Sequence, residues 1–228
     1  MKEYSSQQAD ELHRMHRLKR YLSPQIAEII LRRPNDSSLW EIQRREITVV
    51  FLDLLGFTAF SNSAEPEEVV ALLRKYHAEM GKLVFKFEGT LERFAGDAIM
   101  VVFNDPNPCE QHTEQAVRMA LEMRDRAKIL RTEWLREGYD LSLGVGLAAG
   151  YATLGNMGFE GRMDYGAMGK VPNLAYRLCE EANADQILIN EKTLCKIENI
   201  VEAEPLEKLH LKGFMRPITA FNIVRCKL

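Results

Sequence analysis

The sequence lacks any apolar run long enough to cross a membrane and carries only a small excess of negative charge. Its hydrophobic stretches fall well short of the roughly 20 residues that a membrane-spanning helix needs. The mixed charges at the N-terminus are not those of a signal peptide. A net charge of −3 argues against a nucleic-acid-binding surface. We therefore expect a cytoplasmic protein that binds no nucleic acid.

Cysteine and histidine are also scarce. The four cysteines form no CxxC pair and the five histidines fall into no ligand spacing, so a zinc site is not expected. Reduced thiols agree with a cytoplasmic location. With 228 residues, of which 46% are hydrophobic, the chain can form one domain with a large core and an appendage.

The appendage is expected at residues 1–44, as an N-terminal helical segment and linker for signalling or dimerisation. Leucines and a methionine recur there at helical spacing, but the stripe is too short to be stable alone. Ser23 and Pro24 are typical of the start of a second helix, and Arg33–Ser38 is typical of a linker. The stripe consists of Leu12, Met15, Leu18 and Leu22.

Residues 45–228 alternate between strand and helix patterns. The order strand, helix, strand, strand, helix, strand predicts an α+β fold with a ferredoxin-like βαββαβ core. Gly96-Asp97 joins the second and third strands as a hairpin. The six elements are Ile47–Asp53, Pro66–Phe85, Thr90–Ala95, Ala98–Phe103, Glu110–Arg136 and Leu141–Ala149.

The rest of the chain is expected to add C-terminal helices and strands to this core. Tyr151–Asn156 is predicted to be the hairpin partner of the strand that precedes it. The further predicted elements are a helix at Val171–Ala182, a strand at Gln186–Ile189, a short helix at Glu191–Ile197, and a closing pair near Leu206–Leu211 and Ile218–Val224.

Two aspartates lie beside buried strands. Asp53 ends the apolar run Ile47–Leu52, and Asp97 precedes the apolar run Ala98–Phe103. A carboxylate next to so much apolar surface is unfavourable unless its charge is compensated. Mg²⁺ is typically held by one or two carboxylates together with substrate phosphates. The pattern therefore indicates metal-assisted phosphate chemistry.

Five segments together resemble the catalytic domain of the class III nucleotidyl cyclases, the adenylate and guanylate cyclases. They occur in the order and spacing of that family. The resemblance implies an adenylate cyclase that converts ATP to 3′,5′-cyclic AMP and pyrophosphate by a two-metal mechanism at a homodimer interface. It also implies coupling to an upstream sensor domain. The segments are Phe51–Thr58, Gly89–Phe103, Gly150–Gly158, Asp164–Leu178 and Leu211–Ile218.

The resemblance also implies roles for single residues on one subunit. Asp53, Asp97 and the Leu54 carbonyl would bind two ions of Mg²⁺ or Mn²⁺ in each site. Backbone amides of Gly56, Phe57 and Thr58 would contact the phosphates. These groups would supply one half of each active site.

The other subunit would supply the other half. By the same resemblance, Asn173 orients the ribose, Arg177 stabilises charge on the α-phosphate, and Lys212 contacts the terminal phosphates. Asn173 and Arg177 are four residues apart, so they share one face of a helix. A chain that carries both halves implies a symmetric homodimer with two sites.

The positions for base recognition depart from the family. Arg93 stands where adenylate cyclases usually carry lysine and guanylate cyclases glutamate, and Gly166 occupies the second position that reads the base. Because arginine only donates hydrogen bonds, ATP is the first choice, and a pyrimidine triphosphate or GTP is the alternative. Gly144 stands where many members carry an arginine for the triphosphate. A nucleotide-binding regulatory domain without turnover is therefore a further alternative.

Overall fold

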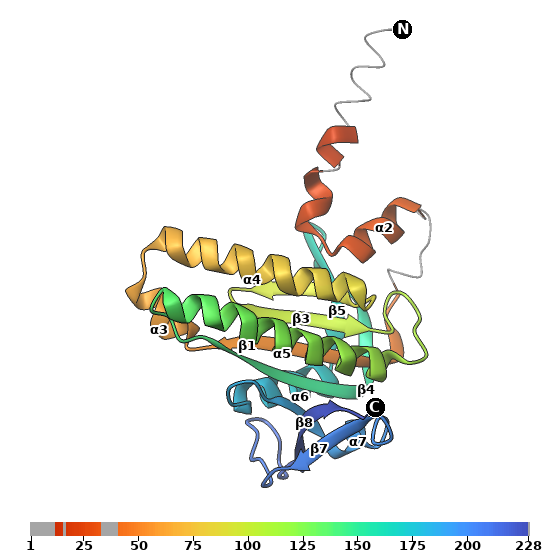
Figure 1. Cartoon of the computed structure of the whole chain (residues 1–228). Helices are drawn as coiled ribbons and strands as arrows, with labels where there is room; N and C mark the ends of the chain where they lie inside the picture. The colour runs from red at the N-terminus through yellow and green to blue at the C-terminus, as the bar shows by residue number, and fades with distance from the viewer. Residues whose placement is uncertain (1–11, 16, 33–40, 228) are drawn as a thin grey trace, which may run out of the picture.

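The computed structural model describes residues 12–15, 17–32 and 41–227 and is built around one eight-stranded sheet (Figure 1). The strands follow the order β2-β3-β1-β4-β6-β8-β7, and β5 pairs with β4 outside this path. Their bounds are β1 Gln43–Leu55, β2 Thr90–Ala95, β3 Ala98–Phe103, β4 Ser142–Phe159, β5 Arg162–Met168, β6 Ile187–Asn190, β7 Val201–Pro205 and β8 Ala220–Cys226.

The first half of the sheet confirms the ferredoxin-like prediction. Strands β2, β3, β1 and β4 lie side by side and pair antiparallel. The helices α4 (Pro66–Lys86) and α5 (His112–Arg136) connect them and cover one face (Figure 1). Pro66 begins α4 together with a capping box between Glu65 and Glu68, which satisfies amides that the first turn leaves unpaired.

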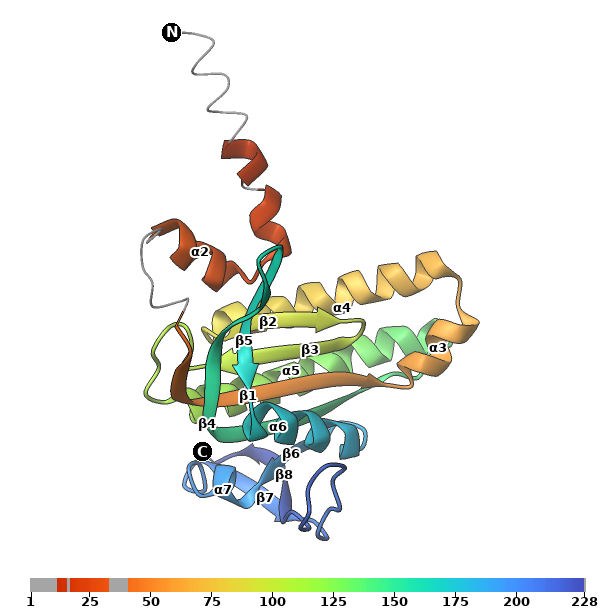
Figure 2. The same cartoon turned by 180° about the vertical axis from the view of Figure 1, so that it is seen from behind.

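The opposite face of the sheet is covered by α6 (Lys170–Glu181) (Figure 2). Alternate residues of β1 point to the two sides, as a strand requires: Leu52 and Leu54 pack with α4 and α5, whereas Ile47 and Val49 pack with α6. Asp53 continues the second series, so its carboxylate lies on the α6 side of the sheet.

One strand prediction was wrong. Tyr151–Asn156 is no separate partner of the preceding strand, because β4 continues through Gly150 to Phe159 and its hairpin partner is β5. The reason lies in β1, which is long enough to pair on both sides of the glycine, from Ser142 to Leu154. A continuous ladder with β1 therefore overrides the local turn signal.

The closing strand pair is also displaced from its predicted position. Strand β7 ends at Pro205 and pairs with β8, whereas the predicted segment Leu206–Leu211 contributes only an isolated bridge from Leu209 to Ile218. The residues of β8 from Phe221 to Cys226 are already paired with β7. The short helix α7 (Glu191–Leu194) follows β6 as predicted.

The N-terminal segment contains helical turns that include η1 (Lys19–Tyr21) and the predicted second helix, α2 (Pro24–Arg32). Leu12 and Leu18 are exposed, whereas Ile26 and Ala27 of α2 are buried. The predicted linker at residues 33–38 lies outside the described residues. Within the described part of the chain, no helix has both the length and the hydropathy of a membrane span.

Candidate functional site

The structure brings Asp53 and Asp97 into contact. Asp53 lies near the end of β1, and Asp97 lies in the tight turn between β2 and β3. Pairing of β1 with β3 in the register Leu52 with Ile99 places that turn beside Asp53. The backbone N–H of Leu54 donates a hydrogen bond to Oδ2 of Asp97 at 3.1 Å, and the two carboxyl groups lie close enough to share a proton in a hydrogen bond.

This contact changes the acidity of Asp53. Burial, followed by the hydrogen bond and the charge of Asp97, raises the pKa of Asp53 to about 7, and the charge of Glu180 adds to the effect. Two adjacent carboxylates cannot both ionise readily without a compensating charge. A hard divalent cation with oxygen ligands suits this donor set.

The protein offers few further ligands for such a cation. Within the described residues, no group of three or more histidine, cysteine, aspartate or glutamate side chains could hold a metal. The donor set is therefore the pair Asp53 and Asp97, with the Leu54 carbonyl as the family resemblance implies. Mg²⁺ at such sites completes its coordination with water and substrate phosphates, so the small number of protein ligands fits a substrate-bound ion.

The turn after β1 presents the next predicted residues. Gly56 adopts a φ of +89° and is the N-cap of α3 (Phe57–Ser63). A Cβ at Gly56 would lie 2.8 Å from the Asp140 carbonyl oxygen, so both conformation and space require glycine. This turn places the amides of Phe57 and Thr58 in the first turn of α3, directly after the end of β1 that carries Asp53.

A cleft beside α6 brings together Asn173, Arg177 and Lys212. All three line this cleft of about 580 Å³, which the turn between β7 and β8 closes on one side. Asp53 and Asp97 do not line this cleft. The paired aspartates lie outside it, but within reach of the charge of Glu180, the ion-pair partner of Arg177.

Glu180 is a residue of this region that sequence reasoning missed. It forms an ion pair with Arg177 and hydrogen-bonds with Tyr176. The Arg177 guanidinium also lies 5.1 Å from the centroid of the Tyr176 ring, which in turn contacts Phe51 of β1 edge-on at 5.5 Å. The i, i+3 spacing of Arg177 and Glu180 is the signal that could have revealed the pair.

Gly146 explains how closely α6 approaches the sheet. A Cβ on Gly146 would lie 2.1 Å from the Ala175 carbonyl oxygen and 2.2 Å from the Cys179 nitrogen. The backbone of α6 therefore rests directly on β4. This contact fixes the helix that carries Asn173 and Arg177.

Gly144 has a different environment. It lies opposite Asp53 in the β1–β4 ladder. A Cβ at this position would approach a methyl carbon of Leu55 at 2.9 Å and the Cβ of Ala182 at 3.4 Å. The space that an arginine side chain would enter is thus filled by apolar groups, and this chain has no triphosphate-binding arginine there.

The two predicted base-recognition residues, Arg93 and Gly166, both lie beside the side chain of Glu92. Arg93 of β2 forms an ion pair with Glu92 at 2.6 Å. A Cβ built on Gly166 of β5 would lie 2.5 Å from the same Glu92 carboxylate. The family resemblance assigned no role to Glu92.

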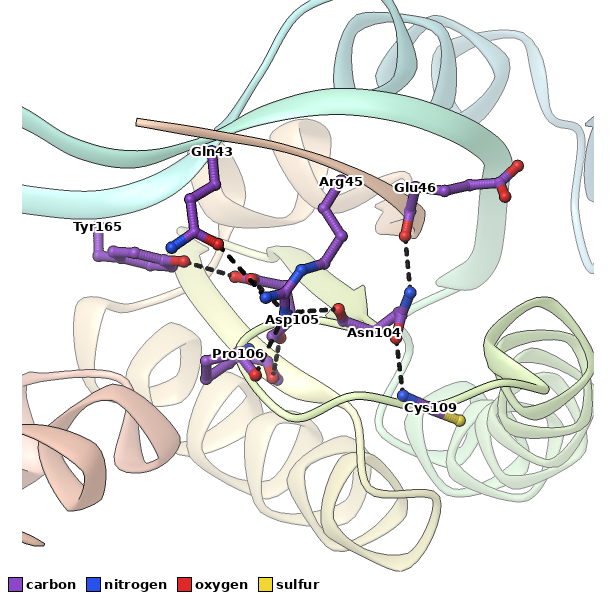
Figure 3. Close-up of polar contacts among 9 residues, drawn as sticks. Gln43, Arg45, Glu46, Asn104, Asp105, Pro106, Cys109 and Tyr165 are labelled. Carbon is purple, nitrogen blue, oxygen red and sulfur yellow. Dashed lines mark hydrogen bonds and ion pairs between the residues drawn. The ribbon is translucent and has the colours of Figure 1, made fainter. Parts of the chain in front are cut away.

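A buried polar network fixes β5 relative to the rest of the sheet (Figure 3). The Tyr165 hydroxyl donates to Oδ2 of Asp105 at 2.9 Å, and Arg45 binds Oδ1 of the same carboxylate at 3.2 Å. Thr90 of β2 donates to the Asp105 carbonyl oxygen at 2.6 Å. Asp105 thereby connects β1, β2 and β5. Burial raises the pKa of Asp105, while Tyr165 and Arg45 oppose the shift.

Comparisons with known proteins identify the family to which this fold belongs. The family model of the adenylate and guanylate cyclase catalytic domain matches residues 41–224 of the sequence. Adenylate cyclase 1 of Rhizobium meliloti is 30% identical over 185 residues, which cover 79% of this chain but only 28% of that protein. The chain thus spans little more than a quarter of this relative's length.

Two solved structures resemble the chain over most of its length. The adenylyl cyclase CyaB from P. aeruginosa is 37% identical, with a TM-score of 0.79 and coverage of 82% of this chain and 97% of that chain. The guanylyl cyclase Cya2 is 30% identical, with a TM-score of 0.74 and coverage of 81% and 94%. From the fold, the paired aspartates and these matches, the chain belongs to the family of adenylate and guanylate cyclase catalytic domains.

Proposed function

We propose that residues 45–228 form the catalytic domain of a homodimeric cyclase that converts ATP to 3′,5′-cyclic AMP and pyrophosphate. The observation that carries this proposal is the contact of Asp53 with Asp97 in a chain that presents Asn173, Arg177 and Lys212 in a separate cleft. Each group is half of a nucleoside triphosphate site. A two-fold dimer would oppose the halves of its two chains and form two complete sites.

The side chains suit an attack of the ribose 3′-hydroxyl on the α-phosphate. Mg²⁺ or Mn²⁺ bound at Asp53 and Asp97 would activate that hydroxyl and neutralise the phosphates. The Arg177 guanidinium, once it leaves Glu180, can donate two parallel hydrogen bonds to the α-phosphate, where negative charge develops. The Asn173 amide can hold the ribose, and Lys212 can hold the departing pyrophosphate.

The preference for ATP rests on Arg93. Its guanidinium offers only donors, which suits the N1 acceptor of adenine. Relatives from Rhizobium meliloti and Anabaena cylindrica are named adenylate cyclases, and the similar Cya2 is a guanylyl cyclase. The alternative of a nucleotide-binding domain without turnover is not favoured, because the chain retains Asp53, Asp97 and Arg177.

The experiment that tests this function is a nucleotide panel. The purified chain is incubated separately with ATP, GTP, CTP and UTP, with Mg²⁺ or Mn²⁺, and the products are identified by mass spectrometry. We expect cyclic AMP as the main product. Absence of a cyclic product from every nucleotide refutes the cyclase, whereas a different cyclic nucleotide corrects only the choice of base.

We also propose that residues 1–44 serve dimerisation and connect the domain to an upstream sensor. Leu12 and Leu18 of the described part are exposed, so they are available to a second copy. The double substitution Leu12→Glu and Leu18→Glu should weaken the dimer in sedimentation measurements. An unchanged dimer dissociation constant would refute this role.

A further inference from the structure

Glu92 and Arg93 are neighbours in a strand, and yet their side chains meet. Glu92 accepts hydrogen bonds from Nε of Arg93 at 2.7 Å and from Nη2 at 2.6 Å. In a regular strand, neighbouring side chains point to opposite faces. Here the pairing of β2 with β3 shifts between Leu91 and Arg93, so that Glu92 is the extra residue of a β-bulge. Bulges of this kind often redirect side chains beside active sites.

Gly166 provides the space for the Glu92 carboxylate. The Glu92 side chain is only 6% exposed, whereas that of Arg93 is 57% exposed. A Cβ on Gly166 would lie 2.5 Å from Oε1 of Glu92, a separation that real atoms do not tolerate. Gly166 is not among the residues with positive φ, so backbone conformation does not require glycine here. Glycine is required at this position because the Glu92 carboxylate occupies the space that a side chain would fill.

Hydrogen bonds to Asp105 fix the strand segments that carry Glu92 and Gly166. Tyr165, next to Gly166, is fixed by its hydrogen bond to Asp105 (Figure 3). Thr90, two residues before Glu92, is fixed by its hydrogen bond to the Asp105 backbone. Both strands that carry the base-recognition positions are therefore anchored to one buried residue. A guanidinium supported in this way is preorganised.

We propose that Glu92 is a positioning residue that sets nucleobase selectivity by holding the Arg93 guanidinium in one orientation. This inference rests on the proposed function. The two hydrogen bonds use Nε and one hydrogen of Nη2, so the donors left for a base are those of Nη1 and the second hydrogen of Nη2. A fixed donor selects bases by where their acceptor atoms lie. An arginine released from Glu92 could follow the acceptors of any base, and selectivity would fall.

The test measures binding separately from turnover. The dimeric chain is titrated calorimetrically with the 3′-deoxy forms of ATP, GTP, CTP and UTP in the presence of Mn²⁺, since these lack the attacking hydroxyl. Glu92→Gln removes the charge partner, and Gly166→Ala displaces the intact Glu92. For both variants we expect the ratio of dissociation constants between the weakest and the tightest analogue to fall about tenfold. In cyclase assays, KM for ATP should change more than kcat.

Matched controls are available elsewhere in the chain. Glu198→Gln alters an exposed glutamate far along the chain from β2, and Gly81→Ala adds a methyl group where nothing lies within 4 Å. Both should keep the wild-type ratio. An unchanged ratio in folded Glu92→Gln and Gly166→Ala overturns the inference, and if Glu92→Gln does not fold, Gly166→Ala decides alone. A wild-type chain that binds the analogues but forms no cyclic nucleotide refutes the proposed function instead.

Discussion

The backbone N–H of Leu54 donates a hydrogen bond to Asp97 Oδ2 at 3.1 Å and so ties the end of β1 to the turn between β2 and β3. Asp97 therefore has a structural partner in addition to its place beside Asp53. Substitutions of Asp97 that keep or remove this hydrogen bond can separate the two roles.

Asp97→Asn keeps an acceptor for the Leu54 amide, whereas Asp97→Ala removes it. Loss of outer residues at metal sites already lowers affinity or activity by 10–100-fold, so we expect either variant to lower kcat/KM with Mn²⁺ at least about a hundredfold. Only Asp97→Ala should also lower the free energy of unfolding, by about 1 kcal/mol. Cyclase assays and urea titrations measure the two effects. Retained activity in Asp97→Asn would contradict a metal-binding role.

Asp53 should make the stability of the metal-free protein depend on pH. Its pKa rises from an ordinary value of 3.8 to about 7 in the folded chain, so between these values the folded state binds more protons than the unfolded state. The free energy of unfolding therefore falls as pH rises from about 4 to about 7. Asp53→Asn should lack this contribution.

The measurement is urea unfolding with a chelator at pH 5 and pH 8, for the wild type and Asp53→Asn. Because a cation competes with the proton, Mn²⁺ should stabilise the wild type more at pH 8 than at pH 5, and the variant only weakly at both. Equal pH dependence in the two proteins would contradict the raised pKa of Asp53.

Two inactive variants should restore activity when they are mixed. Asp97→Ala lacks one half of the site and Arg177→Ala the other. If each site draws on both chains, a heterodimer contains one complete site. Random exchange makes half of the dimers mixed, so about a quarter of the wild-type activity should return. Mixing after covalent locking of each homodimer is the control. No recovery despite proven exchange would place both halves in one chain.

Gly146→Ala should disturb α6, the helix that carries Asn173 and Arg177. The added Cβ would lie 2.1 Å from the Ala175 carbonyl oxygen and 2.2 Å from the Cys179 nitrogen, both of which are backbone atoms of α6. We expect a loss of about 1–3 kcal/mol of unfolding free energy and a lower kcat, because Arg177 moves with the helix. Gly81→Ala in α4 is the matched control and should be neutral or stabilise by up to about 1 kcal/mol. An unchanged melting temperature in Gly146→Ala would contradict this packing.

Tyr165→Phe should destabilise the protein through Asp105. The substitution leaves the buried Asp105 carboxylate with Arg45 but without its hydroxyl donor (Figure 3), which typically costs about 1–3 kcal/mol. Tyr151→Phe alters a tyrosine that is 57% exposed and should have little effect. Urea titrations of both variants measure the difference. Equal stability of Tyr165→Phe and the wild type would argue against this network.

Local chemistry made much of the fold predictable. The helix α4 begins at Pro66 and the hairpin turns at Gly96-Asp97 as the sequence indicated, because caps and turns depend on residues a few positions apart. The long strand β4 could not be predicted in the same way. Its continuation past Gly150 depends on pairing with Gln43–Leu55, which lies about a hundred residues earlier in the chain.

The sequence by itself determined the residue types of the site: two aspartates beside strands, and Asn173 and Arg177 one helical turn apart. Only the tertiary structure decided that Asp53 touches Asp97, that Arg177 pairs with Glu180, and that Glu92 fills the space beside Gly166. The physical reason is the separation along the chain over which each interaction acts. Periodicity and capping act between near neighbours, whereas carboxylate contacts and Cβ-sized spaces arise from strands and helices that meet only after the chain has folded.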